Sequence, residues 1–379
     1  MVNLALKSVL HDWRRYLPVV IAVGVSGLLM VVQLALATGA FRLAAAPVRQ
    51  SSAVLWVGPD SARAVDQSRG LSPFAAGPLW LDPDIVRVEP WRDGQPAMIG
   101  ESAPGAEDAE IGTPVSVVGI PVDRAGLAFA RILPLAVRSA LAEPGTAVIG
   151  PADARKLGLG VGDSLRVGGQ NLRILAIVPG LRGMFGVLVV ASEATARGMA
   201  SGTDTDPAFY QVALRPGADP AAVAERLSAR SREMTVWRSE ALARSTIRIW
   251  ALESGAGEVM MASSGMALAI TLLIVNQSLG AAVAGSLREY AALRAYGVAF
   301  RSVQGIVLRQ GFYVLLGALA ITGLAAATAL AVMSALHVPV GMPLPMALGV
   351  AGVLAAVVMI SNLLALRRLR AADPASLLR

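Results

Sequence analysis

Few residues of this chain have the types and spacing that catalysis or metal binding requires. The sequence has no cysteine and only two histidines, His11 and His337, in segments that the charge pattern places on opposite sides of a membrane. These histidines therefore cannot share a metal ion or complete a nucleophilic triad. The neighbouring acids Glu107 and Asp108 are typical of a solvated loop. We expect neither a catalytic residue nor a metal site, and we expect that the chain is not an enzyme.

Three glycines at 158, 160 and 162 have some likeness to a phosphate-binding loop. Their spacing does not match G-x-G-x-x-G, and no predicted helix follows to present its N-terminus to a phosphate. The pattern GxxxxGK followed by Ser or Thr does not occur in the sequence. We therefore expect a turn at these glycines, and no nucleotide or other cofactor in this chain.

Long apolar runs dominate the elements that would position any site. The sequence is 55% hydrophobic and 16% charged, whereas about a quarter of the residues of a globular protein are charged. The runs 16–41, 259–287 and 310–366 lack Asp, Glu, Lys and Arg. About 20 apolar residues cross a bilayer, and prolines in 337–345 divide the third run by ending its helix. The pattern predicts transmembrane helices at 17–41, 259–287, 310–336 and 346–366.

The distribution of charge predicts which segments face the cytoplasm. Segments 1–16, 288–309 and 367–379 hold eleven of the 33 basic residues but only three of the 26 acidic ones. The positive-inside rule makes these three segments cytoplasmic, including both termini, and places 42–258 and the turn 337–345 outside. The net charge of +7 thus lies along membrane boundaries and not on one folded face. This argues against nucleic-acid binding and predicts a multi-pass protein in contact with lipid.

The first 16 residues are predicted to form an amphipathic helix on the cytoplasmic surface. Arg14 and Arg15 take the polar face at helical spacing, and Trp13 would lie at the level of the lipid headgroups. The alternative is an ordinary start of the first span with basic flanks. Pro18 is expected near the elbow at which the chain enters the bilayer. The first apolar run is longer than the core of a signal peptide, which favours an uncleaved anchor.

Polar side chains inside the predicted spans are uncharged. Asn276 and Gln277 lie in the second span and are predicted to hydrogen-bond between helices, a contact worth about 1 kcal/mol. Because no ionisable residue lies within a span, a proton or ion relay is not expected.

The exterior segment 42–258 is predicted to be an α+β domain. Strands at 164–167 and 171–178 should form a hairpin around Gly168 and Gly169. The other predicted elements are a helix at 152–157, a strand at 210–215 and a helix at 220–230. The stretch 63–112, which is rich in Pro, Gly and acidic residues, gives no prediction.

The charged stretch REYAALRAYGV, residues 288–298, lies between two of the apolar runs. As a helix it places Tyr290, Leu293 and Gly297 on one side, with Arg288 and Arg294 displaced from them. Gly297 would end the helix as a C-cap. A short capped helix on the cytoplasmic side is suited to binding in a groove on another protein.

Several stretches resemble one family. EYAALRAYGV, with Arg288 before it and Arg301 after it, resembles the loop of the FtsX-like permease domain found in MacB, LolC/LolE, FtsX and the DevC group of ABC exporters, and DevC is the nearest in form. AVIGPADARKLGLGVGDSLRVGGQNLRILAIV resembles the MacB-type periplasmic core. RRLRAADPASLLR resembles the family's ending, and the amphipathic lead also agrees. Unlike MacB, this sequence has no fused ATPase, and Tyr296 and Val298 stand where small or apolar residues are commoner.

The resemblance implies a MacB-like, mechanotransmission-type ABC permease of the bacterial inner membrane. Its fold would be four transmembrane helices with a large α+β periplasmic domain inserted between the first two. Rigid helical stalks at 41–50 and 246–258 would carry motion to that domain in a homodimer. A separate ABC ATPase subunit, which holds the ATP and Mg, would bind the coupling helix, that is Arg288, Glu289, Tyr290, Leu293, Arg294, Tyr296 and Gly297. An apolar or amphipathic substrate would then pass to an HlyD-like or MacA-like adaptor and an outer-membrane channel.

Two other functions are compatible with the same plan. One is extraction of lipoprotein or lipid, as in LolC/LolE. The other is FtsX-like signalling to a cell-wall hydrolase, which would need a smaller exterior domain than the one predicted for this chain.

Overall fold

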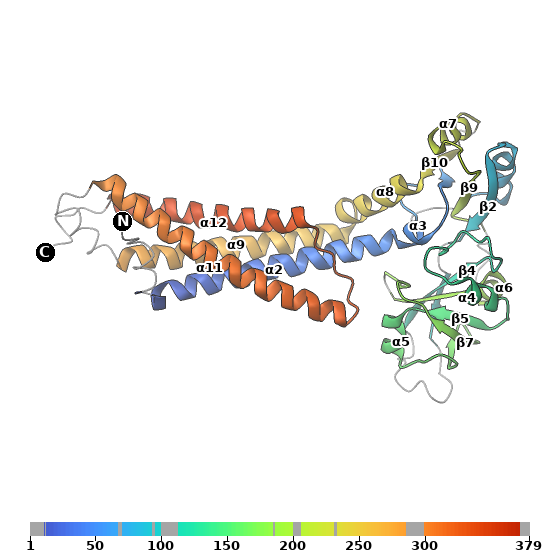
Figure 1. Ribbon diagram of the computed structural model, residues 1–379, viewed down its shortest axis with the longest axis horizontal. Helices are drawn as coiled ribbons and strands as arrows, with labels where there is room; N and C mark the ends of the chain where they lie inside the picture. Colours follow the sequence, from blue (N-terminus) through green and yellow to red (C-terminus); the bar gives the residue numbers. More distant parts are fainter. Residues whose placement is uncertain are drawn as a thin grey trace. The chain divides into compact units, whose positions relative to one another are not determined.

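The computed structural model describes residues 11, 13–66, 70–92, 95–99, 113–184, 186–199, 206–230, 233–285 and 299–371. The chain divides into two compact units (Figure 1). The first unit comprises Met1–Gly39, Gly255–Ala335 and Pro339–Arg379, and its described part is a helical bundle. The second unit comprises Ala40–Ser254 and Leu336–Val338 and contains every strand among the described residues.

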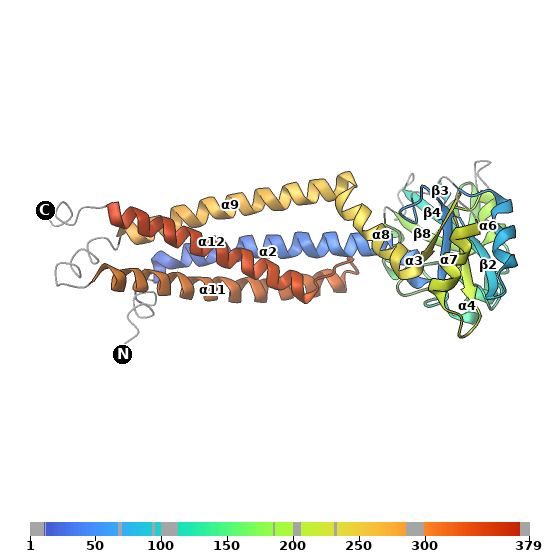
Figure 2. The same ribbon diagram turned by 90° about the horizontal axis from the view of Figure 1, so that it is seen from above.

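Four long helices build the bundle: α2 (Trp13–Ala44), α9 (Gly255–Gly285), α11 (Phe300–Ala335) and α12 (Leu344–Ala371). They run alongside one another in both views (Figures 1 and 2). Each contains a stretch long and apolar enough to cross a membrane: Tyr16–Ala44, Gly257–Gln277, Gln304–Ala335 and Leu344–Leu364. The predicted four-span architecture is thereby confirmed.

Small residues let the helices of the bundle approach closely. A Cβ atom on Gly27 of α2 would lie 2.5 Å from Oγ1 of Thr322 in α11 and 2.7 Å from Cδ1 of Leu354 in α12. The Thr322 hydroxyl also donates to the carbonyl of Gly24 at 3.1 Å. This combination of small residues and hydroxyl bonds is the usual way in which membrane helices pack.

The predicted elbow at Pro18 is wrong, because α2 continues through this residue. Pro18 is the sixth residue of the helix, and it removes only the hydrogen bond to the carbonyl of Arg14, close to an end where several groups lack helical partners anyway. Residues 1–10 and 12, and with them most of the predicted surface helix, lie outside the described part of the chain.

The second unit is an α+β domain with two sheets. The four-stranded sheet has the order β10-β1-β9-β2 and is antiparallel throughout, whereas the six-stranded sheet has the order β3-β4-β8-β5-β7-β6 and is mixed. Trp56 and Trp91 of the first sheet share one buried apolar core with Val118 and Leu188 of the second. The strands are β1 (Leu55–Pro59), β2 (Ile85–Trp91), β3 (Gln95–Met98), β4 (Pro114–Ile120), β5 (Thr146–Ile149), β6 (Ser164–Val167), β7 (Gln170–Ile177), β8 (Val187–Ser192), β9 (Phe209–Leu214) and β10 (Met234–Arg238).

Short helices connect and cover these strands. They are α3 (Ala46–Gln50), the 3-10 helix η1 (Pro73–Leu81), α4 (Leu135–Ala140), α5 (Pro151–Leu157), α6 (Glu193–Met199), α7 (Pro220–Arg230) and α8 (Ser239–Leu252). The predicted hairpin is confirmed: β6 and β7 pair in antiparallel fashion, and Gly168 and Gly169 have φ of 56° and 82°. The helices predicted at 152–157 and 220–230 and the strand predicted at 210–215 are confirmed as α5, α7 and β9. Gly158 ends α5 with φ of 65°, so the predicted turn is confirmed as well.

The stalk helices are not the continuous extensions that the sequence predicts. The predicted stalk 41–50 is interrupted at Ala45, where α2 ends and α3 follows. Pro47 accounts for this break, because it has no N–H and its ring conflicts with the carbonyl of Leu43 in a continued helix. The predicted stalk 246–258 is divided in the same way, because α8 ends at Leu252 and α9 begins at Gly255.

Candidate functional site

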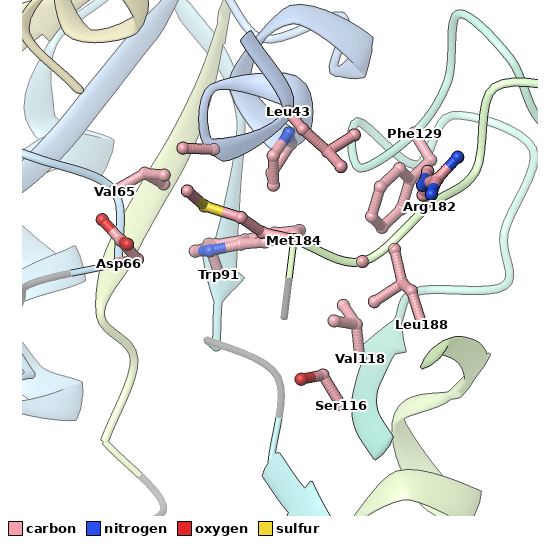
Figure 3. Close-up of a pocket in the computed structure, with 13 residues that line it drawn as sticks. Leu43, Val65, Asp66, Trp91, Ser116, Val118, Phe129, Arg182, Met184 and Leu188 are labelled. Carbon is pink, nitrogen blue, oxygen red and sulfur yellow. The ribbon is translucent and has the colours of Figure 1, made fainter. Parts of the chain in front are cut away.

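The α+β unit contains a pocket of about 310 Å³ between residues of its two sheets (Figure 3). This volume is at the lower end of the range for small-molecule sites. Strand residues form one part of the wall, namely Trp91 at the end of β2, Ser116 and Val118 of β4, and Leu188 of β8. Connecting segments form the rest, with Leu43, Ala44 and Pro47 at the α2–α3 break, Val65 and Asp66 after β1, Phe129 after β4, and Arg182, Gly183 and Met184 before β8.

Aromatic rings packed edge to face form the apolar side of the pocket. The ring centroids of Trp91 and Phe129 lie 5.7 Å apart in an edge-to-face arrangement, and Trp91 packs on Trp56 at the same distance. Such pairs add about 0.5–1.5 kcal/mol to the effect of burial alone. Phe129 has φ of 53°, which is rare for a residue with a side chain. Its carbonyl accepts from the amides of Ile132 and Leu133 at 3.1 and 2.9 Å, so a local turn closes directly after this uncommon backbone conformation.

A buried arginine anchors the loop that carries Phe129. Arg138 is 1% exposed, and its guanidinium donates to the carbonyls of Pro121, at 2.9 Å, and of Ala128. Burial lowers the pKa of Arg138, and the carboxylate of Glu89 opposes that shift. Glu89 is itself buried and accepts from the amide of Leu127 at 2.8 Å. The segment between β4 and α4 is therefore bound through its main chain at several points.

Two polar atoms at the pocket lack partners. Oδ2 of Asp66 accepts from the indole N–H of Trp250 at 2.9 Å, but Oδ1 is buried and has no hydrogen bond in the described part of the chain. Burial raises the pKa of Asp66, against the lowering effects of its own amide and of Trp250. Trp91 is 3% exposed, and its indole N–H is also buried without an acceptor among the described residues.

This arrangement suits binding better than catalysis. Buried donors and acceptors cost free energy when they stay unpaired, so a group that both accepts and donates, such as a hydroxyl or a carboxamide, would satisfy Trp91 and Asp66 together. Figure 3 shows the indole nitrogen of Trp91 on the side of its ring toward Asp66, with Arg182 at the opposite side of the pocket. The lining has no histidine beside a nucleophile. No cluster of three His, Asp or Glu residues among those described could hold a metal ion.

The structure describes only part of the predicted site residues. Trp13 and Arg14 lie in the first turn of α2, as does Arg15, and the Arg14 guanidinium lies 5.7 Å from the centroid of the Trp13 ring. Residues 286–298 lie outside the described part of the chain, and the coupling-helix residues all fall in this range. Their role in binding an ATPase stays a prediction.

The polar contact observed between spans involves other residues than those predicted. Gln33 of α2 donates to the hydroxyl of Ser263 in α9 at 3.3 Å and accepts from Ser264 at 3.1 Å. Asn276 and Gln277 lie farther along α9, half-buried and exposed respectively, and neither forms a bond across the bundle within the described residues. Their interhelical role stays a prediction for an assembly with a second copy.

The sequence pattern does not predict the structural and site roles of Asp66, Trp91, Arg138 and Trp250. The one local signal was a concentration of tryptophan in the exterior segment, where Trp56, Trp91 and Trp250 gather at or beside the pocket. Large aromatic side chains are enriched at ligand sites and interfaces.

Comparison with known proteins gives a family for this chain, and it also finds solved structures at low TM-scores. The family model described as the MacB-like periplasmic core domain matches residues 19–230. The periplasmic region of MacB from Actinobacillus actinomycetemcomitans is similar in structure, with 9% identity and a TM-score of 0.34, over 52% of this chain and 94% of that chain. The extracellular domain of the noncanonic ABC-type transporter YknZ from Gram-positive bacteria has 13% identity and a TM-score of 0.31, over 49% of this chain and 99% of that chain. No curated protein sequence matches.

Proposed function

Because this chain belongs to the MacB-like periplasmic core domain family, whose model matches more than half of its residues, we propose that it is the permease subunit of an ABC exporter powered by a separate ATPase subunit. The predicted MacB/FtsX-like permease family is confirmed by this match. Members of the family are permease components of ABC transporters. Beyond family membership, we propose that the chain exports an amphipathic substrate, that it works with an adaptor, and that a coupling helix links it to the ATPase.

The observation that carries the proposal is the family match to an α+β unit that lies in sequence between two candidate spans. The matched range 19–230 begins inside α2, and α9 follows the α+β unit. In the proposed mechanism, ATP and Mg bind to the partner ATPase, and the helix predicted at 288–298 receives its motion on the cytoplasmic side. The spans then transmit that motion to the periplasmic α+β unit. The permease holds no nucleotide and catalyses no reaction.

Pairing with a second permease copy is supported by the uneven burial of the spans. Only 6% of the apolar window of α9 is buried in the single chain, against 39% for α2. A helix that buries so little of its surface has the largest area free for another copy or for lipid. In the inner membrane of a bacterium, such a homodimer would have its termini in the cytoplasm and its α+β units in the periplasm.

The pocket between the two sheets supports a substrate with both apolar and hydrogen-bonding parts. Val118, Phe129 and Leu188 provide apolar contact, and Trp91 and Asp66 provide the unpaired donor and acceptor. An exporter of this type would release its substrate to an HlyD-like or MacA-like adaptor and an outer-membrane channel. The resemblance to LolC/LolE makes extraction of a lipid or lipoprotein the alternative.

A pair of substitutions in the predicted coupling segment tests the proposal. Leu293→Asp introduces a charge into an expected apolar contact, at a cost of about 2 kcal/mol or more, so ATPase co-purification and export should fall while membrane insertion stays normal. Arg301→Lys is the control, because it keeps the positive charge that sets topology. The isolated permease should hydrolyse no ATP until the ATPase is added. Wild-type co-purification and export with Leu293→Asp would contradict the coupling role.

A further inference from the structure

A second pocket of the α+β unit has three arginines among its seven lining residues. It has a volume of about 470 Å³, and three segments contribute one arginine each: Arg49 at the end of α3, Arg131 in the connection before α4, and Arg244 in α8. Ser239 and Glu240, in the first turn of α8, complete its polar lining.

Main-chain bonds and a common core hold these three segments together. The amide of Arg131 donates to the carbonyl of Gln50 at 3.0 Å, directly beside Arg49 in sequence. Val48 of α3 and Ala243 of α8 are buried in the same apolar cluster. The backbone positions of the arginines are therefore fixed by the fold and do not depend on a ligand.

The pocket has an excess of positive charge. Among the described residues, the side chains of Arg49, Arg131 and Arg244 have neither an ion pair nor a hydrogen bond, although several other arginines of this unit pair with acids. Glu240 is the carboxylate in the lining, so the lining carries three positive charges and one negative charge, and all three arginines are exposed. Like charges repel, and a bound anion would relieve the repulsion among the arginines. Guanidinium groups match the oxygens of phosphate in geometry as well as in charge.

We propose that this pocket binds a phosphate-type anion, with the headgroup of an anionic phospholipid as the favoured source. Connection along the chain supports a lipid. Arg49 follows the end of α2 at Ala44 by only five residues, and Arg244 precedes the start of α9 at Gly255 by eleven. In sequence the pocket therefore adjoins the ends of two candidate spans, and lipid headgroups lie at the ends of membrane spans. This inference does not depend on the direction of transport or on its substrate.

Titration of the full chain in phosphatidylcholine nanodiscs tests the proposal. The probes are a soluble short-chain phosphatidylglycerol, the matching short-chain phosphatidylcholine and inorganic phosphate, with binding measured by calorimetry. Arg131→Gln should weaken phosphatidylglycerol binding about tenfold, as expected for the loss of one charge-assisted hydrogen bond. Glu240→Gln should strengthen binding, because it removes the negative charge from the pocket. Added salt should weaken binding in every form of the protein.

Arg166→Gln is the matched control. Arg166 lies on β6, is exposed and has no ion pair among the described residues, so the substitution makes the same change of charge away from the pocket. The proposed lipid headgroup site is supported if phosphatidylglycerol binds, if Arg131→Gln weakens that binding, if Glu240→Gln strengthens it, and if Arg166→Gln leaves it unchanged. The same pattern with inorganic phosphate and no preference for the lipid supports an anion site for a soluble phosphate. Equal weakening by Arg166→Gln and Arg131→Gln, or no binding of any anionic probe, would overturn the proposal.

Discussion

The indole N–H of Trp250 donates to the Asp66 carboxylate at 2.9 Å and so joins α8 to the segment that follows β1. The second oxygen of this carboxylate is buried without a partner among the described residues. Burial raises the pKa of Asp66 more than its hydrogen bonds lower it, so this pKa lies above its ordinary value of 3.8. Between 3.8 and the raised pKa the folded state binds more protons than the unfolded state, so stability falls as the pH rises through that window.

Asp66→Asn should therefore stabilise the protein at neutral pH, with an advantage that shrinks as the pH falls toward 3.8. The amide keeps an acceptor for Trp250 and removes the buried charge. Thermal unfolding of the full chain in detergent across a pH series measures the difference. Trp250→Phe should extend the decline in stability to higher pH, since the Trp250 bond lowers the pKa of Asp66 in the folded state. Parallel pH profiles for the wild type and Asp66→Asn would contradict this reading.

Gly27→Ala should destabilise the helical bundle by about 1–3 kcal/mol, the usual cost of overpacking. The added methyl would meet Thr322 at 2.5 Å and Leu354 at 2.7 Å. Gly323→Ala is the matched control in α11, because nothing lies within 4 Å of its Cβ position. This control should be neutral or stabilising, since alanine is the better helix former. Unfolding in mixed detergent micelles compares the two, and equal effects would show that the close approach at Gly27 is unimportant.

Arg138→Met should loosen the loop that carries Phe129. The substitution fills similar volume but leaves the carbonyls of Pro121 and Ala128 without their donor, at about 1–3 kcal/mol for each buried group. Hydrogen exchange should become faster at Ile132 and Leu133, whose amides donate to Phe129. Arg138→Lys keeps a charged donor but loses the planar guanidinium that donates to both carbonyls, so its effect on hydrogen exchange should be intermediate. Unchanged exchange in Arg138→Met would show that the loop does not depend on this side chain.

Single cysteines test the predicted orientation in the membrane, since the native sequence has none. Ser139 of α4 and Ser302 near the start of α11 are exposed positions for labelling. An impermeant maleimide should label Ser139→Cys in cells whose inner membrane is intact, and Ser302→Cys only after that membrane is permeabilised. The reverse pattern would place the α+β unit in the cytoplasm.

Local patterns account for the parts of the fold that the sequence predicts. Apolar runs long enough to cross a bilayer identify the spans, and the Gly168–Gly169 pair identifies the β6–β7 hairpin. Each of these signals lies within one short, continuous stretch of sequence. β2 was missed because Glu89 and Pro90 interrupt its apolar pattern. Its position at the edge of the four-stranded sheet explains why a proline is tolerated there.

The candidate site could not be predicted in the same way. Asp66 and Trp91 come from a stretch without periodicity, and Arg182 and Met184 come from a loop more than 90 residues later. Tertiary packing alone brings these side chains together and buries the indole N–H of Trp91 away from any acceptor in the described part of the chain. A local sequence pattern predicts neither the meeting of these distant side chains nor the burial of the Trp91 indole, because both depend on contacts between segments far apart in the chain.

Two of the crossings of the chain between the compact units, one inside α2 and one before α9, differ in backbone structure. One boundary falls between Gly39 and Ala40, inside the continuous helix α2, whereas the other falls between Ser254 and Gly255, in the gap that separates α8 from α9. An unbroken helix transmits torsion as well as axial force, but a short non-helical link leaves rotation free. Turning of α2 about its own axis should thus reach the α+β unit as torque more directly than turning of α9, which Glu253 and Ser254 separate from α8.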